Sequence, residues 1–149
     1  MEITRTAFPP RTIIGIREHD TNPGELFASA VPELFAFAGE HGLQPAGPLI
    51  GLYYDVDDGS FDMAVVIPIA GDAEGTDRVF VDTLEAEAAM TTEHVGPYDG
   101  LTESWTAFMD QMKDDGNEYR MPCWEEYHRG PETDPNPATW QTTLVQPLA

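Results

Sequence analysis

Basic residues, cysteines and long apolar runs are all scarce in this sequence of 149 residues. Seven residues are Lys or Arg, Lys113 being the single lysine, against 27 Asp and Glu, so the net charge is −20 at pH 7. A field of this sign repels phosphate backbones and argues against autonomous binding to DNA or RNA. The acids are dispersed along the chain, which predicts a hydrated surface of the halophilic kind. The alternative is an acidic groove that attracts cationic ligands.

The single cysteine, Cys123, excludes an internal disulfide framework and a multi-cysteine zinc site, and we interpret it as a small buried hydrophobe. No stretch reaches the roughly 18 apolar residues of a membrane span, and no apolar run follows the N-terminal Met1-Glu2. We therefore expect a soluble, cytoplasmic protein. With 41% apolar residues, the chain fits one globular domain that buries about 68–70% of its unfolded surface.

Apolar periodicity and turn signals predict a strand, a helix and two strands, and then the same order again. Asn22-Pro23 starts the first helix, which Pro32 should kink or divide and Gly42 should end. A second helix runs from Leu101 to Gly116. The expected strands are 11–18, 48–55, 61–69, 79–81, 84–95, 119–128 and 139–148, with a turn at Asp57-Asp58-Gly59.

Spacing supports an internal repeat. Gly42, Pro48 and Tyr53 precede Gly116, Pro122 and Tyr127 by one constant offset. Pro68 and Pro147 extend the pattern at a slightly larger offset, which the long loop before Trp140 accounts for. The sequence thus predicts an α+β domain over residues 1–149 with halves at about 8–71 and 78–149. We expect one mainly antiparallel sheet, two helices on one face and a ligand pocket between the halves.

Four segments carry a resemblance to a known family: Pro48-Leu-Ile-Gly-Leu-Tyr-Tyr-Asp55, His94-Val-Gly-Pro-Tyr-Asp-Gly-Leu101 with Trp105, Trp124-Glu-Glu-Tyr127, and Thr143-Leu-Val-Gln-Pro-Leu148. In this order they resemble the GyrI-like small-molecule-binding domain, also called the AraC or MerR effector-binding domain. The resemblance implies the duplicated fold and a pocket between its halves. Family members sense lipophilic, often cationic, drugs when fused to DNA-binding domains. Some free-standing members neutralise toxins, and others hydrolyse strained rings.

The family's pocket acid falls on Glu125, in an E-x-Y pattern with Tyr127, and strand alternation puts both on one face. The middle residue of that pattern is usually apolar in the family but is Glu126 here, so which carboxylate faces the pocket stays open. Gly51, the counterpart of Glu125 in the first half of the repeat, leaves room opposite it and favours Glu125. The candidate aromatic walls of a cation site are Tyr53, Tyr54, Trp124, Tyr127 and Trp140.

Two functions follow, and binding is favoured over catalysis. The first is a free-standing domain that binds a lipophilic or cationic small molecule as a sensor, sequestering agent or toxin-neutralising protein. A regulatory role would then require a protein partner. The alternative is a small hydrolase of strained electrophilic ring compounds, in which Glu125 activates water and Tyr127 hydrogen-bonds the opening ring. The sequence leaves the oligomeric state open.

Cofactors and metals are not expected. The sequence has no glycine-rich phosphate loop and no His or Cys spacing typical of a metal site. Ser29, Ser60 and Ser104 lack a nucleophile turn. His94 precedes the Gly96-Pro97 turn. We favour hydrogen bonding to that turn over catalysis as the role of its side chain.

If the dispersed acids are a halophilic adaptation, the melting temperature should rise steeply between low and molar KCl. Salt shortens the reach of repulsion from about 10 Å at 0.1 M to about 3 Å at 1 M. Thermal unfolding followed by circular dichroism measures this, with sucrose of equal osmolality as the uncharged control. A melting temperature that stays flat in KCl, or that rises equally in sucrose, would contradict the interpretation.

Overall fold

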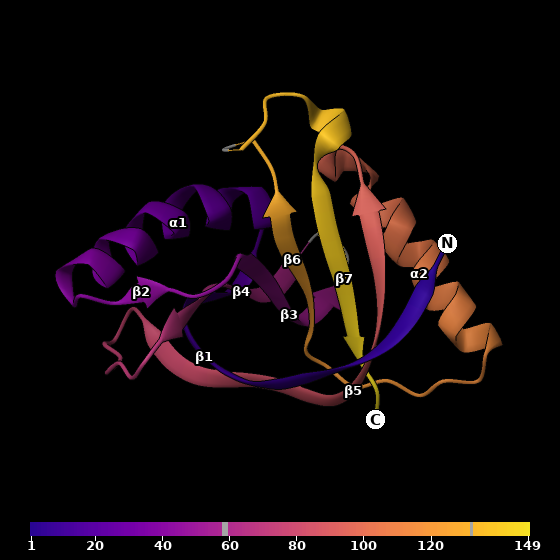
Figure 1. Cartoon of the computed structure of the whole chain (residues 1–149), viewed down its shortest axis with the longest axis horizontal. Coiled ribbons are helices and arrows are strands. Elements are labelled where there is room, and N and C mark those ends of the chain that lie inside the picture. Colours follow the sequence, from indigo (N-terminus) through magenta and orange to yellow (C-terminus); the bar gives the residue numbers. More distant parts are fainter. Residues whose placement is uncertain (58–59, 132) are drawn as a thin grey trace. The chain divides into compact units, whose positions relative to one another are not determined.

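The computed structural model describes residues 1–57, 60–131 and 133–149 (Figure 1). Its elements are β1 (Ile3–Thr21), α1 (Pro23–Glu40), β2 (Gln44–Pro45), β3 (Leu49–Asp57), β4 (Ser60–Ala70), β5 (Phe80–Val95), η1 (Tyr98–Gly100), α2 (Leu101–Asp114), β6 (Cys123–Arg129), η2 (Pro137–Thr139) and β7 (Gln141–Pro147). The chain forms two compact units. The N-terminal unit is Pro9–Glu85, and the C-terminal unit combines Met1–Phe8 with Ala86–Ala149. Strands β1 and β5 contribute to both units.

In the N-terminal unit, β4 lies between β1 and β3, and both pairings are antiparallel. Val66 of β4, for example, is opposite Gly15 on one side and Ile50 on the other. The short β2 pairs with the end of β4. Helix α1 begins where the sequence predicts, because the Asn22 side chain accepts hydrogen bonds from the first free backbone N–H groups. Its buried residues are Leu26, Ala30, Leu34, Phe37 and Ala38.

In the C-terminal unit, β7 is the central strand between β5 and β6, again with antiparallel pairing. The start of β1 lies beside β5, where the Thr92 hydroxyl donates to the Glu2 carbonyl at 2.7 Å. Helix α2 buries Phe108 and Met112 completely, together with Leu144 of β7. This packing fixes which face of β7, and of the neighbouring β6, is turned toward α2.

The predicted repeat is confirmed by the ends of the two helices, where equivalent residues make the same hydrogen bonds. Leu43 N donates to Ala38 O at 2.8 Å after α1, and Asn117 N donates to Met112 O at 3.0 Å after α2. The glycines within these turns, Gly42 and Gly116, have φ values of 65° and 77°. Both helices therefore end in the same left-handed glycine turn.

The strand register repeats as well. The pairs Ile50↔Val66, Gly51↔Val65, Leu52↔Ala64 and Tyr53↔Met63 recur in the same order as Trp124↔Val145, Glu125↔Leu144, Glu126↔Thr143 and Tyr127↔Thr142. In both hairpins an irregularity follows the tyrosine. The α+β class, the mainly antiparallel pairing and the duplicated strand-helix-strand-strand order are thus confirmed. The placement of both helices on one face and the pocket between the halves stay predictions.

Several element boundaries differ from the sequence prediction. Residues 79–81 and 84–95 do not form two strands, because β5 runs continuously from Phe80 to Val95. The expected strand 11–18 is part of the longer β1, which runs from Ile3 to Thr21. The expected strand 119–128 begins only at Cys123, and Tyr119 forms a single bridge to Leu148. Pro32 does not divide α1. The predicted turn at residues 57–59 lies largely outside the described residues.

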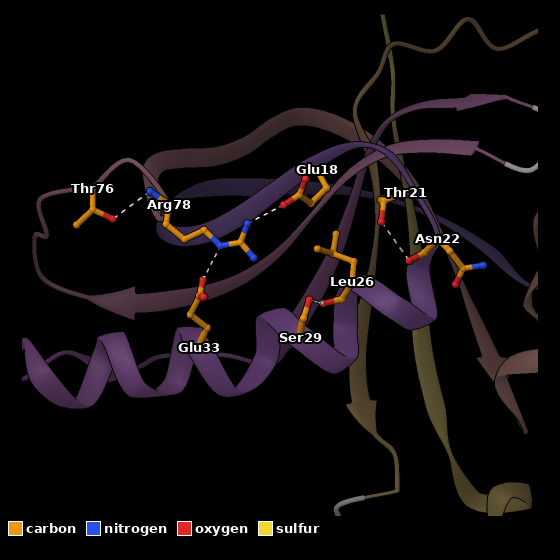
Figure 2. A network of polar contacts seen from close by, with 8 residues as sticks. All are labelled: Glu18, Thr21, Asn22, Leu26, Ser29, Glu33, Thr76 and Arg78. Carbon is orange, nitrogen blue, oxygen red and sulfur yellow. Dashed lines mark hydrogen bonds and ion pairs between the residues drawn. The ribbon is translucent and has the colours of Figure 1, made fainter.

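Two of the few arginines bind acidic groups within the N-terminal unit. Figure 2 shows Arg78 donating to Glu33 of α1 at 2.8 Å and to Glu18 of β1 at 2.6 Å. Arg17 binds Asp62 through two nitrogens, which holds the pKa of that carboxyl below its usual range. These exposed pairs relieve the acidic repulsion locally and add little stability individually.

Neither α1 nor α2 combines the length and the apolar character that a membrane-spanning helix requires, within the part of the chain that the structure describes.

Replacing Gly42 or Gly116 by alanine should destabilise the fold by about 1–2 kcal/mol each, because a Cβ disfavours the left-handed conformation. Gly39 is the matched control. It lies inside α1 with nothing within 4 Å of an added Cβ, so Gly39→Ala should stabilise by about 0.5–1 kcal/mol. Urea unfolding measures all three. Equal effects at Gly39 and Gly42 would contradict the assignment of the turn.

Candidate functional site

The two adjacent acids of β6 point to opposite faces of the strand. Glu125 is paired with Leu144, which packs on α2, so Glu125 and Tyr127 lie on the face turned toward α2. Glu126 lies on the other face with Trp124, whose indole N–H donates to Glu126 Oε2 at 2.8 Å. The structure thus places Glu125 and Tyr127 together and Trp124 away from them.

The carboxylate of Glu125 is held by two aromatic side chains. Tyr127 donates its hydroxyl to Oε1 at 2.5 Å, and Trp105 of α2 donates its indole N–H to Oε2 at 2.7 Å. Glu125 is only 3% exposed. Burying a carboxylate is costly unless its oxygens are hydrogen-bonded, and bonds to a charged acceptor are the stronger ones. The two donors therefore fix the carboxylate in position among aromatic rings.

Further rings extend from this carboxylate within the C-terminal unit. Tyr98 of η1 meets the Tyr127 ring edge-on, with centroids 5.6 Å apart, and its centroid lies 4.8 Å from that of the Trp140 ring. Trp140 is anchored by its indole N–H on Asp134 O at 2.8 Å. Two of the predicted aromatic walls, Tyr127 and Trp140, are thus connected through Tyr98.

Trp105 and Tyr98 are the site residues that the sequence reasoning missed. In the sequence both residues belong to a segment that carries the family resemblance, and neither is among the predicted walls. The available signal was chemical, because a buried indole N–H or phenol normally finds a hydrogen-bond partner. Trp105 is such a case, because its indole N–H meets the buried Glu125.

Thr142 stands opposite Tyr127 and shares its face of the sheet. The residue is fully buried, and its hydroxyl oxygen has no hydrogen-bond partner among the described residues. Leaving a buried hydroxyl unpaired costs about 1–3 kcal/mol. It is therefore a polar group that a bound molecule could engage.

The remaining predicted walls belong to the N-terminal unit. Gly51 occupies the register position equivalent to that of Glu125, and Tyr53 that of Tyr127. The Tyr53 ring is nearly buried, and its centroid lies 5.9 Å from that of Phe61. The guanidinium of Arg17 lies 3.7 Å over the Tyr54 ring, so one face of that ring already holds a cation. Participation of these residues in a site with Glu125 stays a prediction.

Burial raises the pKa of the Cys123 thiol to about 12, with a smaller contribution from the negative charge of Glu125. The thiol is therefore protonated at neutral pH and does not act as a nucleophile. No group of three or more His, Cys, Asp and Glu side chains gathers as a metal site within the described ranges.

The model of the GyrI-like small molecule binding domain matches residues 1–149. The chain belongs to this family. No curated protein matches the sequence of this GyrI-like chain. Solved structures do match it in fold.

Three of these structures show how much of each chain is shared. The EcmrR chain of an EcmrR–DNA complex is 18% identical with a TM-score of 0.89, and the alignment covers 99% of this chain and 57% of that one. The crystal structure of the EcmrR C-terminal domain is 19% identical with a TM-score of 0.80, covering 99% and 97%. SAV2435, solved with bound tetraphenylphosphonium, is 15% identical with a TM-score of 0.67, covering 100% and 94%.

The thiol of Cys123 should react with a disulfide reagent such as DTNB only after unfolding. At pH 8 a pKa of about 12 leaves roughly 10⁻⁴ of the thiol as thiolate, against about a tenth or more for a free cysteine. We expect labelling of the native protein to be at least about 10²-fold slower than in guanidinium. Thr102→Cys, at an exposed position of α2, is the reactive control. Comparably fast labelling at both cysteines would contradict the burial of Cys123.

Proposed function

We propose that this GyrI-like domain binds a lipophilic cation at the Glu125 carboxylate. The observation that carries the proposal is the buried Glu125, whose two oxygens accept hydrogen bonds from Trp105 and Tyr127. A negative charge among aromatic rings attracts a cation by Coulomb attraction and by the ring quadrupoles together. The unpaired Thr142 hydroxyl offers a further polar contact.

The hydrogen bonds to Glu125 favour a particular class of cation. Because protein groups already donate to both oxygens, a ligand need not supply N–H donors of its own. A delocalised or fully substituted cation, such as a phosphonium or quaternary ammonium, gains the electrostatic attraction without losing strong hydrogen bonds to water. Tetraphenylphosphonium in the related SAV2435 structure is a cation of this class.

The biological setting of this binding is part of the proposal. The chain spans 57% of the EcmrR chain that was solved with DNA, and a role in regulation would act through a protein segment or partner that contacts DNA. Sequestering or neutralising a toxic cation requires no partner. A cytoplasmic location, with no direct contact to nucleic acid or membrane, is proposed on the strength of the acidic composition. Ring hydrolysis by Glu125 and Tyr127 stays a prediction that no further observation favours.

Glu125→Gln should weaken binding of tetraphenylphosphonium by about tenfold to a hundredfold, equivalent to about 1–3 kcal/mol. The substitution nearly preserves volume and removes the charge, so a neutral triphenyl compound such as triphenylmethanol should bind the variant and the parent alike. Isothermal titration calorimetry measures both affinities.

Glu126→Gln is the matched control, since Glu126 is similarly buried on the other face of β6. Unchanged phosphonium affinity in Glu126→Gln, together with the loss in Glu125→Gln, supports the proposal. A larger loss in the Glu126 variant, or no loss in either, would overturn the assignment of Glu125.

A further inference from the structure

A second cluster of reactive groups lies at the beginning of α2, in a shallow hollow of about 430 Å³ within the C-terminal unit. His94, near the end of β5, and Ser104, in the first turns of α2, both line it and are partly exposed. Glu125, Trp105 and Tyr127 are not among its lining residues. The hollow is therefore lined by other residues than the proposed cation site, which it adjoins where His94 stands opposite Thr142 in the sheet.

The hydrogen bonds of His94 determine which ring nitrogen carries the proton in the neutral imidazole. Nε2 lies 2.9 Å from the Pro97 carbonyl oxygen, which can only accept, so Nε2 must be the protonated nitrogen. Nδ1 is then an acceptor, and it lies 2.7 Å from Ser104 Oγ. The Ser104 hydroxyl therefore donates to His94 Nδ1.

This is the arrangement of an activated serine. A base accepts the hydroxyl proton, and a third group, here a backbone carbonyl, fixes the tautomer and orientation of the base. The backbone also leaves space for the ring, since a Cβ added to Gly100 would lie 3.0 Å from His94 Cε1. Glycine at this position thus allows the imidazole to occupy the place that the hydrogen bonds require.

We propose that Ser104 and His94 form an acyl-transfer site for small esters that carry a positive charge. Ser104 Oγ attacks the ester carbonyl carbon while its proton passes to His94 Nδ1. The bond from carbon to the alcohol oxygen breaks, and the imidazolium returns the proton to the leaving alkoxide. Water then gives a proton to Nδ1 and attacks the acyl-serine, which releases the carboxylic acid and restores the Ser104 hydroxyl.

Charge selects the substrate class. Glu93 and Glu103 also line the hollow, and both are exposed. The Glu93 carboxylate accepts from Thr143 at 2.8 Å on the other face of the sheet, so we assign the attraction of cations and the exclusion of anionic esters to Glu103, next to Ser104. A choline-like ester fits this preference and the small volume of the hollow.

The test uses acetylthiocholine with the full-length protein, reading thiol release and the acetyl group on Ser104 by peptide mass spectrometry. Its neutral isostere, 3,3-dimethylbutyl thioacetate, should react more slowly. Ser104→Ala should abolish both signals, and His94→Gln should lower the rate by about 10² or more. Gly100→Ala, which presses on the imidazole, should lower it as well. Circular dichroism establishes that each variant is folded.

Ser29→Ala is the matched control and should react like the parent. Ser29 is also a helical serine, but it donates to the Leu26 carbonyl and not to a histidine (Figure 2). No acetylation of Ser104, or acetylation that continues undiminished in folded His94→Gln, would overturn the proposal. The His94–Ser104 hydrogen bond would then only anchor the start of α2.

Discussion

The negative charge of Glu125, buried inside the C-terminal unit, is the constraint around which that unit is arranged. A buried carboxylate needs hydrogen-bond donors, and here they come from two different elements, Trp105 of α2 and Tyr127 of β6. The helix is therefore tied to the strand by a charge-assisted bond in addition to the packing of Phe108 and Met112 on Leu144. Because both donors are aromatic, they satisfy the charge while keeping its surroundings apolar.

The two hairpins show how one backbone pattern carries different chemistry. Their registers repeat pair by pair. At the position where the C-terminal hairpin has Glu125, the N-terminal hairpin has Gly51, and at the position of Glu126 it has Leu52. Among the residues whose burial the structure describes, the buried acids thus belong to one copy of the repeat. The other copy keeps the geometry without the charge, so the proposed binding chemistry is asymmetric although the fold is duplicated.

If two neighbouring carboxylates were buried on the same face of β6, they would repel each other strongly. Strand alternation separates Glu125 from Glu126, and each acid has its own indole donor, Trp105 or Trp124. This explains how β6 accommodates an acid where the family usually has an apolar residue. Trp124 supplies the hydrogen bond that makes a charged side chain tolerable there, and the ring of Phe8 meets the indole edge-on with centroids 5.5 Å apart.

Local signals in the sequence determined the order of the elements, the start of α1 at Asn22-Pro23 and the left-handed ends at Gly42 and Gly116. Capping groups and glycine conformations act within a few residues, so they can be recognised without knowledge of the fold. Alternation likewise determined that Glu125 shares a face with Tyr127. The continuity of β5 and of α1 through Pro32 was not predictable in this way, because tertiary pairing and packing override weak local preferences.

Only the tertiary structure decided which acid faces α2 and which residues surround it. Alternation along the strand puts Glu125 and Glu126 on opposite faces, but it does not tell which of the two faces is turned toward α2. The choice is made by the packing of α2 on Leu144, which comes from β7, the strand that follows β6 along the chain. The same packing brings Trp105 to Glu125 and Ser104 to His94. Contacts of this kind depend on where a helix docks on a sheet, and that is set by the complementary shapes of their buried side chains.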